Sequence, residues 1–171
     1  MTQSWAPSTV LPKPVMDRVW GVSYPGLDLT ADRLSEVFRV SDGPVILLAA
    51  FMEITTAVSA DANTMSWVFD SDAGGDRVIA SGLNIISAAL GDFIWAELDG
   101  TALVAATTST GLIHGGYYRG TATGYGTILT SGAIDLVFAG NATDAGVGTL
   151  YCMYEPMIDG ASMHKGTVVA T

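Results

Sequence analysis

One pattern fills most of this chain: short runs rich in Val, Ile, Thr, Phe, Trp and Tyr alternate with turn residues such as Gly, Asp and Asn. β-Branched and aromatic runs bounded by turn residues are typical of strands, whereas helix signals are weak here. Residues 34–158 contain about eight such runs at short spacing, as β-sandwiches do. The sequence therefore predicts an all-β protein: a jelly-roll-like antiparallel β-sandwich with an extended N-terminal arm.

The longest expected strand, Val45–Val58, carries information about both of its faces. Its even-numbered positions are nearly all apolar, which indicates one face that is buried throughout. Its odd-numbered positions are apolar as far as Phe51 and become polar at Glu53 and Thr55. The second face is therefore expected to be covered only along its first half, by another sheet or by another subunit.

Alternation and turn chemistry predict the remaining strands. Thr64–Phe69 alternates with its apolar residues at odd positions and leads into a turn at residues 70–76. Thr30–Phe38 is compatible with one or two helical turns or with a strand beginning at Glu36. Asp99-Gly100 favours a two-residue type I′ hairpin. Further strands are expected at Val78–Ile86, Phe93–Leu98, Thr101–Thr107, Leu112–Tyr118, Tyr125–Thr130, Ala133–Phe138 and Val147–Tyr154.

Proline content and periodicity divide the chain into an N-terminal arm at residues 1–33, a β-sandwich domain at 34–158 and a C-terminal tail at 159–171. The arm holds four of the six prolines, yet its Trp5 and Trp20 are residues that disordered tails usually lack. We expect an ordered arm that lies across a neighbouring subunit or caps its own core. The tail can add a short strand at Thr167–Ala170.

The composition indicates a protein that is covered by other protein. Only 14% of the residues are charged, 49% are apolar and the mean hydropathy is +0.40. Charged residues make up about 25% of an ordinary soluble domain. At 171 residues, about a third of the surface of the unfolded chain stays exposed after folding, so one core cannot hide this apolar excess. We therefore expect first a subunit of an assembly, and only second a free-standing domain; a homo-oligomer is the form that the family resemblance described below implies.

Charge and sorting signals restrict the partners further. The net charge of −10 argues against binding to nucleic acid or to anionic membranes, both of which need a basic surface. The longest aliphatic run, Gly43–Met52, is much shorter than the roughly 20 residues of a membrane span. Residues 1–20 show no apolar signal core. We expect synthesis in the cytoplasm, with neither nucleic acid nor membrane as a partner.

Few residues are candidates for chemistry. Asp70, Asp72 and Asp76 could surround a hard cation, but the twelfth position of an EF-hand loop counted from Asp70 is Ser81 instead of Glu. A solvated turn is the preferred interpretation of these acids. The single cysteine, Cys152, excludes an intrachain disulfide and lies in an apolar run, so an inert buried thiol is expected.

Three further features complete the candidates. Tyr117, Tyr118 and Tyr125 lie on Gly-rich segments that could bind a sugar or a partner protein, although ordinary strand residues beside turns are the preferred interpretation. Glu53 is expected to be partly buried, at a solvated edge or paired with Arg39 or Arg77. The glycosylation triplet Asn141-Ala142-Thr143 is interpreted as a coincidence. No trio of nucleophile, base and orienting group can be assembled, so we predict no enzyme activity and no catalytic, cofactor or metal residues.

The sequence contains five phrases, Val37–Val45, Met52–Val58, Gly132–Leu136, Tyr154–Pro156 and Asp159–Ala161. Together they are similar to phrases of tailed-bacteriophage structural proteins. In that family a phrase like lFtVsGGpVlI leads into GEVTTAI, and the later part carries G.I.L, a strand, Y.P and DGA. Asp42 and Met52 stand where the family has glycine, and residues before 34 lie outside the resemblance.

This resemblance implies a virion structural protein, in particular a head decoration (cement) protein that binds the major capsid protein on the capsid surface, often as a β-rich trimer. It brings no catalytic residues. A tail or fibre-base structural subunit and a carbohydrate-binding β-sandwich module remain alternatives. The expected location is the virion.

Overall fold

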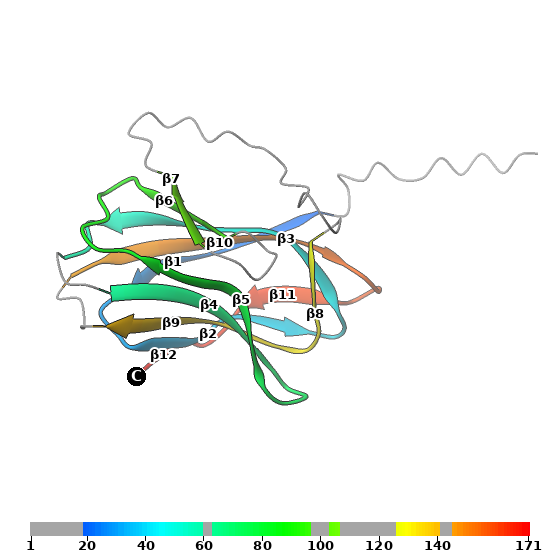
Figure 1. The fold of residues 1–171 in the computed structure, drawn as a ribbon. Helices are drawn as coiled ribbons and strands as arrows, with labels where there is room; N and C mark the ends of the chain where they lie inside the picture. The colour runs from blue at the N-terminus through cyan, green and yellow to red at the C-terminus, as the bar shows by residue number, and fades with distance from the viewer. Residues whose placement is uncertain (1–18, 60–62, 97–102, 107–125, 141–144) are drawn as a thin grey trace, which may run out of the picture.

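The computed structural model describes residues 19–59, 63–96, 103–106, 126–140 and 145–171, and these residues form two antiparallel six-stranded sheets packed face to face (Figure 1). Sheet A contains, in spatial order, β1 (Trp20–Asp28), β10 (Val147–Pro156), β3 (Val45–Thr56), β6 (Phe93–Ala96) and β7 (Leu103–Ala106), with β8 (Thr127–Leu129) also paired to β3. Sheet B contains β11 (Ser162–Lys165), β2 (Arg33–Ser41), β9 (Gly132–Gly140), β4 (Asn63–Ser71) and β5 (Asp76–Asn84), with β12 (Val169–Ala170) also paired to β2.

The pairing order is that of a jelly roll. Strand β1 pairs with β10, β2 with β9, β3 with β6 and β4 with β5, all antiparallel, so the pairs are nested like one long folded hairpin. The hairpin is rolled up because β10 also pairs with β3 and β9 also pairs with β4. Two sheets joined in this way are the jelly-roll solution for antiparallel strands. The all-β antiparallel sandwich predicted from the sequence is confirmed.

Strand β2 settles the alternatives left open for Thr30–Phe38, because the segment from Arg33 onward is extended. Its pairing with β9 shifts register between Leu34 and Phe38, where Glu36 has a φ of 53°. This bulge adds two residues to β2 relative to β9, and Leu34, Val37 and Phe38 are all buried in the core. The apolar spacing that suggested a helix is therefore produced by a bulged strand.

Strand β3 also contains a bulge, and it corrects one prediction. Its register with β10 shifts between Leu47 and Ala49, which leaves Leu48 as the extra residue. Val45 and Leu47 are fully buried before the bulge, and the buried positions after it are even-numbered, beginning at Ala50. The prediction of one continuous even-numbered inner face was wrong at the start of the strand, because an inserted residue exchanges the two faces.

The hairpins agree with their turn chemistry. Residues 72–75 connect β4 to β5, and both Gly74 and Gly75 have positive φ, as the predicted turn requires. Strands β6 and β7 pair Ala96 with Leu103, which is the register that a two-residue turn at Asp99-Gly100 needs. That turn itself and the strand predicted at 112–118 lie outside the described residues.

Segments on both sides of residues 34–158 contribute strands to the sandwich. Strand β1 belongs to the predicted arm and forms an edge of sheet A, with Leu27 and Leu29 buried in the core. Strands β11 and β12 belong to the predicted tail and pair with β2. The short strand expected within Thr167–Ala170 is confirmed at its last residues. Lys165 Nζ lies 5.6 Å from the ring centroid of Tyr24, which connects the two segments.

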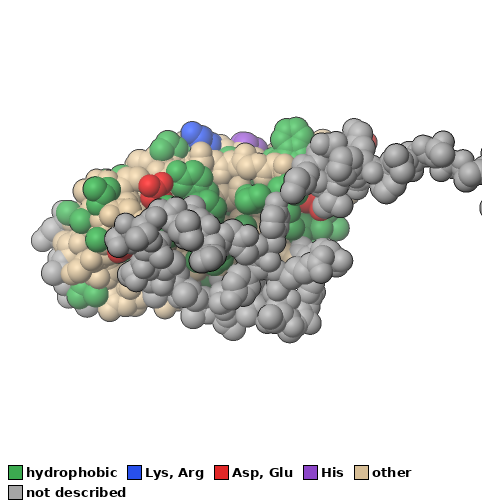
Figure 2. Space-filling view, turned by 90° about the horizontal axis from the view of Figure 1, so that it is seen from above, with side chains coloured by type: hydrophobic (Ala, Val, Ile, Leu, Met, Phe, Trp, Pro, Cys, Tyr) green, Lys and Arg blue, Asp and Glu red, His purple; other side chains and the backbone are tan. Residues whose placement is uncertain are grey.

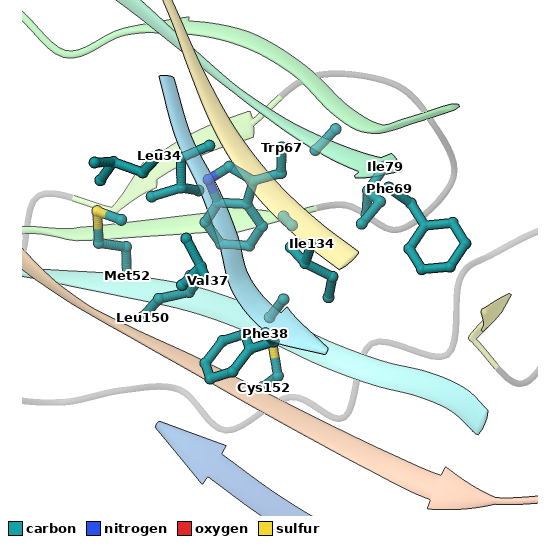
Figure 3. Packing of buried hydrophobic residues seen from close by; sticks show 14 of the residues in the cluster. Leu34, Val37, Phe38, Met52, Trp67, Phe69, Ile79, Ile134, Leu150 and Cys152 are labelled. Carbon is teal, nitrogen blue, oxygen red and sulfur yellow. The ribbon is translucent and has the colours of Figure 1, made fainter. Parts of the chain in front are cut away.

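The core lies between the sheets and draws on nearly every strand (Figure 3). Trp67 of β4 is its largest fully buried side chain, and Figure 3 shows it between the two sheets beside Leu34 and Val37. The inward positions Met65, Trp67 and Phe69 predicted for this strand are confirmed. The indole Nε1 of Trp67 has no hydrogen-bond partner in the structure. Shape and apolar contact therefore hold this ring in place.

Met52 of β3 packs into space that Gly148 leaves open on the neighbouring strand β10. A Cβ on Gly148 would lie 2.8 Å from Met52 Sδ and 3.0 Å from its Cγ. Gly148→Ala is expected to cost about 1–3 kcal/mol by overpacking. The cost should be smaller in a Met52→Ala background, with a coupling energy of about 0.5–3 kcal/mol. Urea unfolding of the four proteins of this double-mutant cycle measures it, and strictly additive changes would contradict this packing.

Candidate functional site

The outer face of sheet A carries a row of stacked aromatic rings, which we call the aromatic row: Tyr151, Phe51 and Trp95. The residues are direct cross-strand neighbours on β10, β3 and β6. The ring centroid of Phe51 lies 4.9 Å from that of Tyr151 and 5.4 Å from that of Trp95, with interplanar angles of 15° and 12°. Phe93 adds a tilted contact at 6.3 Å. Such pairs stabilise a sheet, and they also make this outer face apolar.

Glu53 lies at the margin of the aromatic row. It accepts a 3.2 Å hydrogen bond from the Tyr151 hydroxyl, and it is partly buried as predicted. Partial burial, followed by this hydrogen bond and the charge of Glu53, raises the pKa of Tyr151 above its usual value. The predicted partners Arg39 and Arg77 were wrong, because both belong to strands of sheet B whereas Glu53 faces outward from sheet A.

The outer face of sheet B has the opposite chemistry, and its centre is a carboxylate that the sequence analysis missed. Asp135 of β9 is 1% exposed although it alternates with the inward residues Ile134 and Leu136. It accepts hydrogen bonds from Arg33 Nε at 2.9 Å and Nη2 at 2.5 Å, and from the backbone N–H of Glu36 at 2.8 Å. The hydrogen bond to Asp135 raises the pKa of the Arg33 guanidinium. Asp135 thus fixes the β2 bulge.

The three acids Asp70, Asp72 and Asp76 are separated by arginines instead of converging on one point. Asp72 accepts two 2.7 Å hydrogen bonds from Arg39 Nη2, and Asp76 lies 3.4 Å from Arg33 Nη1. Within the described ranges, no group of three or more His, Cys, Asp or Glu residues is arranged to hold a metal ion. The geometry is that of a solvated turn tied to sheet B by ion pairs.

The two outer faces therefore differ in kind. Figure 2 looks onto the sheet A side, and the described part of this surface shows many hydrophobic side chains and few charged ones. The ion pairs of the structure gather on sheet B, around Arg33 and Arg39. The rings of the aromatic row are partly buried, and they make the described outer face of sheet A more apolar than that of sheet B.

Cys152 lies in the core, where the sequence placed it. It is buried in β10, and its burial strongly raises the pKa of the thiol. The thiolate is the reactive form, so this environment suppresses nucleophilic chemistry. Figure 3 shows Cys152 beside Phe38, between the sheets.

This burial predicts slow thiol chemistry in the folded protein. At pH 8, Cys152 should react with a disulfide reagent at least about a thousandfold more slowly in the native protein than in urea, because reaction requires opening. Stability should fall above the ordinary thiol pKa of about 8.5, because the unfolded thiol then loses its proton while the folded thiol keeps it. Absorbance of the released reagent measures the rate, and similar rates in both states would contradict the burial.

Two turns lie against each other at one end of the sandwich. Asp42 and Gly43 have φ angles of 59° and 134°, and Asp tolerates the first of these positions while glycine suits the second. A Cβ on Gly43 would lie 2.5 Å from Ile158 Cδ1 and 3.2 Å from Ala161 Cβ. Met157 donates its backbone N–H to the carbonyl oxygen of Pro44 at 3.1 Å. The turn at residues 42–44 and the segment at residues 157–161 therefore pack against each other.

Other predicted sites cannot be placed. Tyr117, Tyr118, nearly the whole of their Gly-rich region with Tyr125, and the triplet at 141–143 lie outside the described residues. Carbohydrate binding by these tyrosines stays a prediction. In the described part of the chain there is no helix with the length and apolar character needed to cross a bilayer.

No protein-family model matches the chain, and no curated protein matches it either. Among solved structures, a chain from the structure of the infectious bursal disease virus Gx strain is similar, with a TM-score of 0.37 and 11% sequence identity. The match covers 85% of this chain and 38% of that one, so this chain spans well under half of its length.

Proposed function

We propose that this chain is a virion structural protein that decorates and stabilises the head of a tailed bacteriophage. In this proposal it binds the major capsid protein on the outer capsid surface, as a homotrimer. The support comes from the phrases shared with phage structural proteins across residues 34–162 and from a composition too apolar for a free domain. A tail or fibre-base subunit is the alternative that the same features allow.

The contrast between the two outer faces carries the proposal. The aromatic row Tyr151–Phe51–Trp95 and its neighbour Phe93 form an apolar surface on sheet A, where Glu53 is already hydrogen-bonded to Tyr151. Burial of apolar surface stabilises an interface by about 25 cal/mol per Å². Sheet B, with its exposed ion pairs, is suited to face water. A subunit that binds the assembled shell but not its free parts stabilises the assembly by linkage.

The first test is the oligomeric state. Light scattering on the purified chain should give the mass of a trimer at micromolar concentration. Trp95→Lys should shift this mass toward the monomer, because it places a charge in the aromatic row. The matched control is Val78→Lys, on the exposed part of sheet B, which should leave the mass unchanged. A monomer at every concentration, with folding verified by circular dichroism, would contradict self-association through sheet A.

The second test is location on the particle. Antibodies against the purified chain should label the heads of phage particles from the virus that encodes it, as seen by electron microscopy. The purified chain should also bind heads that lack it and raise their resistance to heat. Labelling of the tail or baseplate would favour the alternative, and absence of the chain from particles would overturn both.

A further inference from the structure

The strands of the two sheets carry charges of different sign. The strands of sheet A contain acidic residues and no basic ones, and these acids are Asp28, Glu53 and Glu155. The basic residues of the described part all belong to strands of sheet B, and they are Arg33, Arg39, Arg77 and Lys165. An acid on sheet A therefore has no basic neighbour on its own sheet.

Glu53 is the acid of sheet A that lies beside the aromatic row. It follows Phe51 by two positions on β3, so both side chains point to the outer face. Its cross-strand neighbours are Thr149 on β10 and Phe93 on β6. The carboxylate accepts a hydrogen bond from the Tyr151 hydroxyl at 3.2 Å, and the residue is half-buried. Water therefore still hydrates part of this charge in a single copy of the chain.

Two further acids lie at the ends of the neighbouring strands. Asp28 ends β1, and Asp92 directly precedes β6. Each accepts a hydrogen bond from a nearby backbone N–H: Asp28 Oδ1 from Thr30 at 3.0 Å, and Asp92 Oδ2 from Ala89 at 2.8 Å. Within the described residues, these two acids and Tyr151 are the titratable groups that β1, β10, β6 and β7 bring to this part of the outer face. None of them can neutralise a carboxylate.

The basic residues of sheet B are committed elsewhere in the fold. Arg33 and Arg39 form ion pairs with acids of sheet B, and Lys165 lies over the ring of Tyr24. Arg77 belongs to β5, a strand that the proposed contact through sheet A leaves uncovered. A second copy that covers sheet A would thus remove water from the carboxylate without bringing a described base to it. Burial without a counter-charge disfavours the charged form of a carboxyl group.

We propose that self-association through sheet A takes up protons at Glu53, so that mild acid favours the assembled form. This inference rests on the proposed self-association and adds its regulation. A glutamate in water binds a proton only below about pH 4.3, but burial beside the aromatic row favours the neutral form at higher pH. The neutral carboxyl group still accepts the hydrogen bond of Tyr151. Each proton taken up tightens association by up to about tenfold for every unit by which the pH falls.

Light scattering of the full chain over a concentration series tests this proposal. The concentration at which half of the chain is associated should fall at least about tenfold between about pH 7 and about pH 5.5. Glu53→Gln should show the same fall already at neutral pH, where acid unfolding plays no part, and should respond less to pH. The matched control is Asp72→Asn, which removes an equal charge from an exposed ion pair on sheet B. It should keep the response of the parent chain, with folding verified by circular dichroism.

Four results would overturn the proposal. Weaker association in acid and in Glu53→Gln would show that a base of the second copy meets this carboxylate. Association that ignores pH would remove the regulation and leave self-association intact. Equal strengthening in Asp72→Asn would indicate that acid acts only by reducing the net charge of −10. A parent chain and a Glu53→Gln variant that both stay monomeric at every pH would overturn the regulation together with the proposed self-association.

Discussion

Replacing Gly166 with alanine is expected to lower the free energy of unfolding by about 3 kcal/mol, the upper range for overpacking. Gly166 follows β11 and donates its backbone N–H to the carbonyl oxygen of Val37 at 3.1 Å. A Cβ at this position would lie 1.9 Å from the carbonyl oxygen of Glu36 and 2.8 Å from its carbonyl carbon. These are backbone atoms of the β2 bulge, so neither partner can move aside cheaply.

Urea unfolding measures this effect, and hydrogen exchange locates it. Exchange should increase most at residues 162–170, because the substitution separates β11 and β12 from β2. Gly21→Ala is the matched control, since a Cβ on Gly21 would meet nothing within 4 Å. It should change stability by no more than about 0.5 kcal/mol. Equal stability of the Gly166→Ala and Gly21→Ala proteins would show that the C-terminal segment does not pass over the bulge as described.

Removing the carboxylate of Asp135 is the second large effect. Asp135→Ala should cost about 1–3 kcal/mol, because it leaves the Glu36 N–H without its buried acceptor and the partly exposed Arg33 guanidinium without its shortest ion pair. The Glu36 N–H depends on Asp135 more than the Arg33 guanidinium does, because Glu36 is held at a φ of 53°. Asp135→Asn keeps an oxygen for this N–H but loses the charge. It should therefore cost clearly less than the alanine variant.

Thermal and urea unfolding of the two variants, compared with Asp72→Ala, check this assignment. The side chain of Asp72 is 45% exposed where it pairs with Arg39. Exposed ion pairs contribute up to about 1 kcal/mol, so Asp72→Ala should be nearly neutral. If Asp135→Ala and Asp72→Ala destabilised the protein equally, Asp135 would not be the anchor of the bulge.

Local patterns predicted the strands well because alternation and turn residues act over a few neighbouring positions. The β4–β5 hairpin, with its inward Met65, Trp67 and Phe69 and its glycine turn, was predictable in this way. The buried Cys152 followed from its apolar run. Part of the apolar outer face of sheet A was also predictable. The odd-numbered positions of β3 are apolar as far as Phe51, which indicated a second face covered by another sheet or another subunit.

The sequence missed features that depend on partners far along the chain. Asp135 looks like an ordinary outward residue, and its partner Arg33 is 102 residues away. The aromatic row needs β10, β3 and β6 side by side before its three rings can stack. Neither contact leaves a local pattern, so neither could be predicted.

Alternation and turn chemistry by themselves determined that this chain is an antiparallel β-sandwich with an apolar excess. Only the tertiary structure decided the nested order of the strands and the positions of the bulges at Glu36 and Leu48. A bulge forms where one strand carries extra residues relative to its neighbour, so its position depends on pairing between distant segments. That pairing determines which side chains face the core and which are left for a partner.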